Sequence, residues 1–243
     1  MRESSKNKLI VALDVSTAHQ ARELVQTLRG VVGMFKIGSQ LFTGAGPDIV
    51  REIIKSGSRV FLDLKFHDIP STVAAAGAEA TRLGVSLFNL HAAGGSEMMR
   101  RTAEAVSRTA DAEGLTRPSV IAVTVLTSAE AATLSEIGIS FSTEDQVRSL
   151  SLLAEASGMD GVVASPREIA LVRSAIKRER FLVVTPGIRP SGSELYDQKR
   201  VMTPAEALSG GADYLVVGRP ITSAKDPTQA AEHIIDQMAR VFA

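Results

Sequence analysis

Short apolar segments alternate with helix-like segments through the whole chain of 243 residues. The apolar segments have no polar face, which is typical of strands buried on both sides in a parallel sheet. We expect strands at 9–13, 34–38, from Val60 onward, and at 87–91, 120–126, 161–164, 181–184 and 214–217. Eight strands that alternate with helices predict one α/β domain over residues 1–243, a (β/α)8 TIM barrel.

Capping residues and prolines set the expected helices between these strands. We expect helices at 18–28, 46–54, 72–83, 96–110 and 142–156, and helices that begin near Pro166, Pro204 and Pro227. Residues 1–8 are interpreted as a polar N-terminal extension. The alternative fold is an open, doubly wound sheet. It is disfavoured because no G-x-G-x-x-G motif follows the first strand.

Composition excludes several classes of partner. Lys plus Arg and Asp plus Glu both number 27, so no basic surplus indicates a nucleic-acid partner. Cysteine is absent, which excludes a disulfide framework and a thiolate metal site within this sequence. No apolar run approaches the length of a transmembrane helix, so we expect no membrane partner. These features fit a cytoplasmic protein.

Charged residues interrupt the strand that begins at Val60. Asp63 and Lys65 are two residues apart and should point to the same face of that strand, and Asp68 follows in the exit segment. Burying such charges is costly unless they pair and form hydrogen bonds. The pattern therefore indicates either a structural ion pair or a functional site.

Further polar residues stand at the other expected strand ends. TIM barrels place their chemistry at the C-terminal ends of the strands. In this chain those ends carry Asp14, Lys36, the Asp63/Lys65/Asp68 group, His91, Thr127, Arg189 and Arg219. A ring of charge at one end of the barrel favours a site over an isolated ion pair.

The last two strand ends have the character of an anion site. Barrel phosphate sites usually lie after strands seven and eight. Gly187 and Gly218 permit backbone N–H groups to approach an anion closely. The guanidinium groups of Arg189 and Arg219 can each donate two hydrogen bonds to phosphate oxygens. Gln198, in the long polar segment before Val201, could donate to the same anion.

Lys36, Asp63, Lys65 and Asp68 form a candidate network of alternating charge. Opposite charges hold one another ionised in a pocket of low dielectric constant. Lys65 would then be an oriented proton donor. Metal binding is disfavoured because two lysine ammonium groups among the carboxylates would oppose a divalent ion.

With these residues identified, the chain resembles the bacterial form of the orotidine 5′-phosphate decarboxylase family over nearly its whole length. The matching segments are 12–14, 35–38, 63–70, 124–128, 185–190, 197–198 and 217–220. Two of them are long and specific to the family: Asp63-Leu64-Lys65-Phe66-His67-Asp68-Ile69-Pro70, and Thr185-Pro186-Gly187-Ile188-Arg189-Pro190.

The resemblance implies decarboxylation of orotidine 5′-monophosphate (OMP) to UMP, the last step of de novo UMP synthesis, without a metal or cofactor. It implies that Lys65 protonates C6 and that Asp63 lies against the departing carboxylate. Lys36 would link Asp63 to the ribose, Asp14 would bind the ribose and Thr127 the pyrimidine. The phosphate would be held by Arg189, Gln198, Gly218 and Arg219, and the implied substrate-binding set also includes Ile69 and Pro186.

The resemblance also implies a homodimer in which Asp68 and Thr72 reach into the partner's site. Two alternatives remain open. One is the sister group of magnesium-dependent decarboxylases and aldolases, such as 3-keto-L-gulonate 6-phosphate decarboxylase, which typically carries an acid where this chain has Lys36. The other is a catalytically silent barrel that binds a phosphate ligand, although a pure binder has no need of Lys65 with its two acids.

Overall fold

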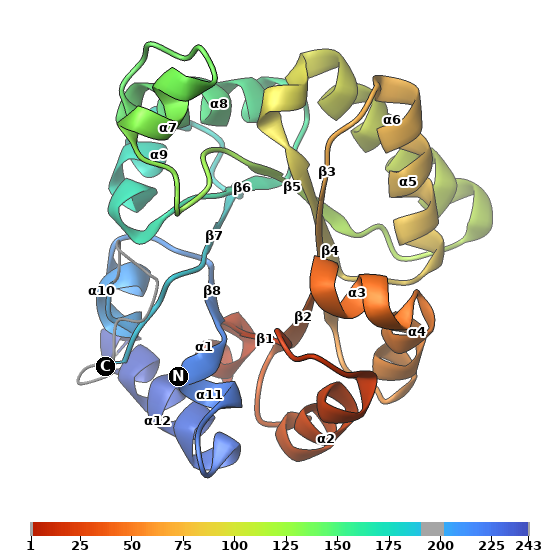
Figure 1. Ribbon diagram of the computed structural model, residues 1–243, viewed down its shortest axis with the longest axis vertical. Helices are drawn as coiled ribbons and strands as arrows, with labels where there is room; N and C mark the ends of the chain where they lie inside the picture. The colour runs from red at the N-terminus through yellow and green to blue at the C-terminus, as the bar shows by residue number, and fades with distance from the viewer. Residues whose placement is uncertain (1, 191–201, 243) are drawn as a thin grey trace.

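A closed barrel of parallel strands forms the centre of the computed structural model, which describes residues 2–190 and 202–242 (Figure 1). The strands pair in sequence order and β8 returns to β1, so the sheet has no free edge. They are β1 (Leu9–Ala12), β2 (Met34–Gly38), β3 (Val60–Phe66), β4 (Leu87–His91), β5 (Ser119–Val123), β6 (Gly161–Val163), β7 (Leu182–Thr185) and β8 (Tyr214–Val217). The predicted TIM barrel is confirmed.

Helices surround the barrel in Figure 1 and connect each strand to the next. The main ones are α2 (Ala18–Leu28), α4 (Asp48–Lys55), α5 (Pro70–Arg82), α6 (Gly95–Glu113), α8 (Thr143–Ala156), α9 (Ile169–Ala175), α10 (Pro204–Ser209) and α12 (Pro227–Ala239). Local sequence explains several of their starts. Thr17, Ser142 and Asp226 each accept a hydrogen bond from a backbone N–H of the first turn. Pro70, Pro204 and Pro227 occupy first-turn positions.

Two apolar clusters hold the barrel together. The larger lies between the strands and the helices and includes Leu9, Val11, Phe35, Leu62 and Phe88. The smaller fills the barrel interior and consists of Ile10, Ala12, Met34, Phe61, Leu87, Ile121, Val184 and Val216. Since side chains alternate along a strand, the inward position after each interior residue lies nearer the C-terminal end. Lys36, Asp63 and Asn89 occupy such positions, so polar side chains lie next to the interior apolar cluster, on its C-terminal side.

β3 contains an irregularity where it carries the charged residues. Leu62 pairs with Phe88, but the next pair is Phe66 with Leu90, so β3 advances four residues while β4 advances two. The extra length forms a bulge over residues 63–65, opposite Asn89. Lys65 has φ 52° within it and is the one non-glycine residue with positive φ among those the structure describes.

The sequence missed several short helices. α3 (Ser39–Ala45), α7 (Ala131–Glu136) and α11 (Arg219–Thr222) are too short to carry a clear helical period. Residues 2–8, predicted as a polar extension, form helix α1 (Arg2–Lys8). Strand five was predicted to reach residue 126 but ends at Val123, level with the end of β6. In the part of the chain described, no helix is long and apolar enough to cross a membrane.

Candidate active site

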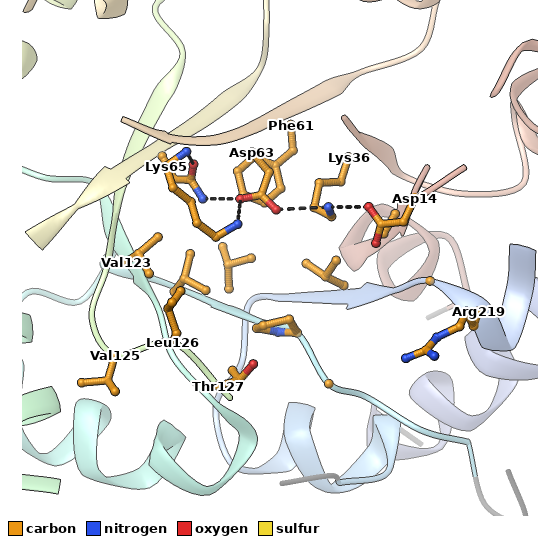
Figure 2. Close-up of a pocket in the computed structure, with 18 of the residues that line it drawn as sticks. Asp14, Lys36, Phe61, Asp63, Lys65, Val123, Val125, Leu126, Thr127 and Arg219 are labelled. Carbon is orange, nitrogen blue, oxygen red and sulfur yellow. Dashed lines mark hydrogen bonds and ion pairs between the residues drawn. The ribbon is translucent and has the colours of Figure 1, made fainter. Parts of the chain in front are cut away.

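A cavity of about 500 Å³ opens at the C-terminal ends of the strands. It takes lining residues from every strand or from the loop that follows it (Figure 2). Ten residues predicted from the sequence line it: Asp14, Lys36, Asp63, Lys65, Thr127, Pro186, Gly187, Arg189, Gly218 and Arg219. The fold thus brings together side chains as far apart in the sequence as Asp14 and Arg219, because parallel strands end at the same edge of the barrel.

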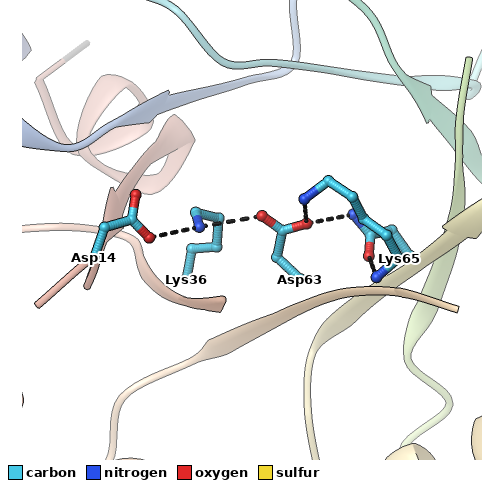
Figure 3. A network of polar contacts seen from close by, with 5 residues as sticks. Asp14, Lys36, Asp63 and Lys65 are labelled. Atoms are coloured by element: carbon cyan, nitrogen blue, oxygen red, sulfur yellow. Dashed lines mark hydrogen bonds and ion pairs between the residues drawn. The ribbon is translucent and has the colours of Figure 1, made fainter. Parts of the chain in front are cut away.

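Four charged side chains cross one side of this cavity in a row (Figure 3). The Lys36 Nζ lies 3.0 Å from Asp14 Oδ1 and 3.1 Å from Asp63 Oδ2. The Lys65 Nζ lies 2.6 Å from Asp63 Oδ1. The side chains of Lys36 and Asp63 are only 10% and 11% exposed, whereas that of Asp14 is 58% exposed. The row therefore runs from solvent at Asp14 to a buried carboxylate at its centre.

Mutual charge keeps the centre of the row ionised. Burial works to raise the pKa of Asp63, but the Lys36 and Lys65 ammonium groups and hydrogen bonds from Lys65 and Asn89 outweigh it, and the pKa lies below its usual range. Burial likewise works to lower the pKa of Lys36, but Asp63 and Asp14 outweigh it and raise that pKa. Both groups are therefore charged at neutral pH.

These pKa shifts predict a pH-dependent contribution to stability. The depressed pKa of Asp63 stabilises the fold above the unfolded-state pKa of about 4, and this stabilisation is lost as the pH falls through the folded-state pKa. We expect Asp63→Asn to destabilise the protein by about 3 kcal/mol at neutral pH, and by progressively less below about pH 4. Denaturant unfolding of both proteins across pH measures this difference. The exposed Asp48→Asn is the control, and a difference for Asp63→Asn that does not change with pH would contradict the assignment.

The segments after β7 and β8 supply cationic and glycine residues to the cavity. Arg189 follows β7 and is buried, while Arg219 follows β8 and is exposed. Gly187, between β7 and Arg189, has φ 78°, a conformation that side chains disfavour. A Cβ on Gly218 would meet the Ala12 Cβ at 3.6 Å and Asp14 Oδ2 at 3.8 Å. This end of the cavity can accommodate an anion near two guanidinium groups.

Three predicted site residues lie elsewhere. Asp68, Ile69 and Thr72 are exposed on the segment from β3 into α5 and do not line the cavity. The Asp68 Oδ1 accepts a hydrogen bond from the Ile69 N–H at 2.6 Å, and Ile69 is 63% exposed. Gln198 lies outside the described residues. The single chain therefore does not bring Asp68 and Thr72 to its own cavity.

Sequence reasoning missed Asn89 and the apolar wall. Asn89 is 1% exposed and forms hydrogen bonds to both Asp63 and Lys65. Its signal in the sequence was a polar residue at the centre of an otherwise apolar strand. Apolar side chains also line the cavity beside the charged row: Ala12, Phe61, Val123, Val125, Leu126, Val163, Val184 and Val216. They lower the local dielectric constant and so strengthen the interactions of the row.

Comparison with known proteins gives a consistent result. The model of the orotidine 5′-phosphate decarboxylase / HUMPS family matches residues 7–234. The curated orotidine 5′-phosphate decarboxylase of Geobacter sulfurreducens is 55% identical over 237 residues, and that of Syntrophotalea carbinolica is 53% identical over 239 residues. In both cases the alignment covers 98% of this chain and 98% of the relative.

Solved structures agree. The crystal structure of orotidine 5′-phosphate decarboxylase from Lactobacillus acidophilus superposes with a TM-score of 0.84 at 36% identity, covering 95% of this chain and 98% of that one. An uncharacterized conserved protein from Geobacillus kaustophilus superposes with a TM-score of 0.83 at 35% identity, covering 95% and 99%.

Proposed function

Because the chain belongs to the orotidine 5′-phosphate decarboxylase / HUMPS family, we propose that it performs the reaction for which its curated relatives are named. It is a carboxy-lyase that converts OMP to UMP and carbon dioxide in pyrimidine nucleotide synthesis. The observation that carries this assignment is the row Asp14–Lys36–Asp63–Lys65 across the cavity.

Lys65 is proposed as the proton donor. When the bond between C6 and the carboxylate carbon breaks, carbon dioxide leaves and the electron pair remains on C6. No carbonyl group is placed to delocalise that charge, so the site must stabilise it electrostatically. The Lys65 ammonium, oriented by Asp63 at 2.6 Å, can do so and then transfer a proton from Nζ to C6.

Asp63, Lys36 and Asp14 are proposed to act on the rest of the nucleoside. Asp63 is held ionised by its two lysines, so it would face the substrate carboxylate as a like charge that is relieved when carbon dioxide leaves. Lys36 joins Asp63 and Asp14, and this contact supports a proposed role of Lys36 and Asp14 in holding the ribose. Asp68 is the remaining catalytic candidate and belongs to the dimer proposal below.

We propose that residues after β5, β7 and β8 bind the base and the phosphate of OMP. Arg189, Gly218 and Arg219, with Gln198, are proposed for the phosphate, and Thr127 and Pro186 for the base. Binding energy from the phosphate, remote from C6, can be used to order the site for the chemical step. Ile69 is proposed as a further contact from the exposed segment after β3.

The alternative within the family is a magnesium-dependent reaction on a sugar phosphate, and Lys36 opposes it. Its ammonium group occupies Asp63 Oδ2 and Asp14 Oδ1, the oxygens that a divalent ion would need. Product analysis distinguishes the two. The purified protein should convert OMP to UMP and carbon dioxide, and should leave 3-keto-L-gulonate 6-phosphate with Mg²⁺ unchanged. The reverse selectivity would overturn the proposal.

A homodimer with shared sites is proposed for Asp68 and Thr72. Both residues are exposed on the side of the barrel that carries the cavity, together with Ile69. A twofold interface there would place Asp68 and Thr72 of each subunit at the cavity of the other.

Mixing two inactive variants tests this arrangement. Lys65→Ala and Asp68→Ala subunits, unfolded and refolded together, should recover activity from about one quarter of the sites, because each mixed dimer holds one intact site. The kcat per subunit of the mixture, compared with each variant alone, is the measurement. No recovery in a mixture shown to contain mixed dimers would place Asp68 in its own subunit's site. The absence of a metal, a cofactor or a nucleic-acid partner and the cytoplasmic location stay predictions.

A further inference from the structure

Asn89 is the polar residue at the centre of β4 and lies opposite the bulge in β3. Its Nδ2 donates to Asp63 Oδ1 at 2.7 Å, and its Oδ1 accepts a hydrogen bond from the Lys65 backbone N–H at 2.8 Å. The orientation of the amide is unambiguous, because one partner can only accept and the other can only donate. One buried side chain thus engages both ends of the irregular segment.

These two bonds act on different degrees of freedom. Asp63 Oδ1 accepts a hydrogen bond from Asn89 Nδ2 and pairs with Lys65 Nζ, while Asp63 Oδ2 pairs with Lys36 Nζ. These three contacts fix the plane of the carboxylate. The bond to the Lys65 N–H holds a backbone conformation that costs a non-glycine residue about 1 kcal/mol or more. A regular strand would pair that N–H with β4 backbone, and the bulge removes this option.

We propose that Asn89 is a positioning residue. Its bond to the Lys65 backbone N–H orients the Lys65 ammonium, and its bond to the Asp63 carboxylate orients that side chain. The inference rests on the proposed function and extends it. Asn89 itself supplies no proton and carries no charge. Its contribution is to hold the two reacting side chains in the geometry that the chemical step needs.

Two near-isosteric substitutions separate the bonds. Asn89→Leu removes both. Asn89→Asp keeps the acceptor for Lys65 but places a second carboxylate against Asp63. We expect either change to lower kcat by about 10²-fold at neutral pH, because misplacement of a reacting group by about 1 Å has an effect of that size. KM should change little, since the phosphate and ribose contacts come from other residues.

The pH profile separates positioning from a general structural defect. Two adjacent carboxylates share one proton as the pH falls, which restores a donor between position 89 and Asp63. The ratio of kcat for Asn89→Asp to wild type should therefore rise about tenfold from about pH 8 to about pH 5, whereas the ratio for Asn89→Leu should stay flat. Thr102→Val is the matched control, because it removes a buried hydroxyl bond to the Met98 carbonyl, on α6.

The outcomes are distinct. If wild type fails to decarboxylate OMP, the proposed function itself is wrong. If wild type turns over and Asn89→Leu, or Asn89→Asp at neutral pH, retains its kcat, Asn89 does not position the site. If both variants lose kcat but the Asn89→Asp ratio does not respond to pH, the loss is a general packing defect and the inference is overturned. Circular dichroism melts of all variants show the folded fraction.

Discussion

Lys65→Ala is expected to lower kcat for OMP decarboxylation by about 10⁴-fold or more. The substitution removes both the charge that stabilises the C6 carbanion and the proton that quenches it, effects of about 10²–10³ and 10²–10⁴ when taken separately. KM should change much less, because the predicted phosphate ligands Arg189 and Arg219 are intact. The measurement is the loss of the orotate chromophore under saturating OMP.

Stability should hardly change in this variant. The Lys65 side chain is 35% exposed, so solvent screens its pair with Asp63, and Asp63 keeps the buried Lys36 ammonium and Asn89 as partners. The exposed Lys55→Ala serves as the control for loss of a lysine. Lys65→Arg should not restore activity, since a planar guanidinium cannot replace a compact ammonium. A Lys65→Ala enzyme with more than about one hundredth of wild-type kcat would exclude Lys65 as the proton donor.

Lys36→Met is expected to damage both stability and activity. It removes the buried ammonium partner of Asp63 and leaves only that of Lys65, whose side chain is 35% exposed, and it frees Asp14 from the row. Breaking a buried ion pair from one side costs about 3–5 kcal/mol, which corresponds to a fall in Tm of about 6–20 °C for a chain of this size. The kcat/KM should fall by about 10³-fold, since Asp63 loses its orientation and the predicted ribose contact is lost.

A double-mutant cycle with Asp63→Asn checks the cause. If the destabilisation arises from an uncompensated carboxylate, neutralising Asp63 should relieve it. The double variant should then be destabilised by about 1–3 kcal/mol less than the sum of the two single variants. Denaturant unfolding of the four proteins gives this coupling free energy. Strict additivity would mean that Lys36 stabilises the fold by packing alone.

The pKa of Lys36 is raised, so its side chain stabilises the fold only while it is protonated. This contribution should persist below about pH 10 and be lost as the pH rises through the folded-state pKa.

The barrel was predictable because its signals are local. Each strand is a short apolar run, and residues such as Thr17, Ser142 and Asp226 mark helix starts within a few positions. The strand-end rule then placed Asp14, Lys36, Asp63 and Lys65 at one edge without knowledge of any contact. Their common location follows from parallel topology alone.

What the sequence did not predict depends on pairing between strands. Alternation predicted that Asp63 and Lys65 share a face, and both do line the cavity, but they do so through a bulge with Lys65 at positive φ. A bulge depends on the register between β3 and β4, which no local pattern specifies. The role of Asn89 follows from that register and was missed for the same reason. Residues 124–126 look like strand but leave the sheet, because β6 ends level with Val123.

Turnover of OMP by wild-type protein that has been dialysed against EDTA and assayed with EDTA present decides whether the reaction needs a metal. An ammonium that both stabilises the carbanion and supplies the proton needs no divalent ion, so we expect the same rate of UMP formation with EDTA as without it. Turnover that disappears with EDTA and returns with Mg²⁺ would exclude Lys65 as the sole source of stabilisation and assign the chemistry to a metal held by Asp14 or Asp63.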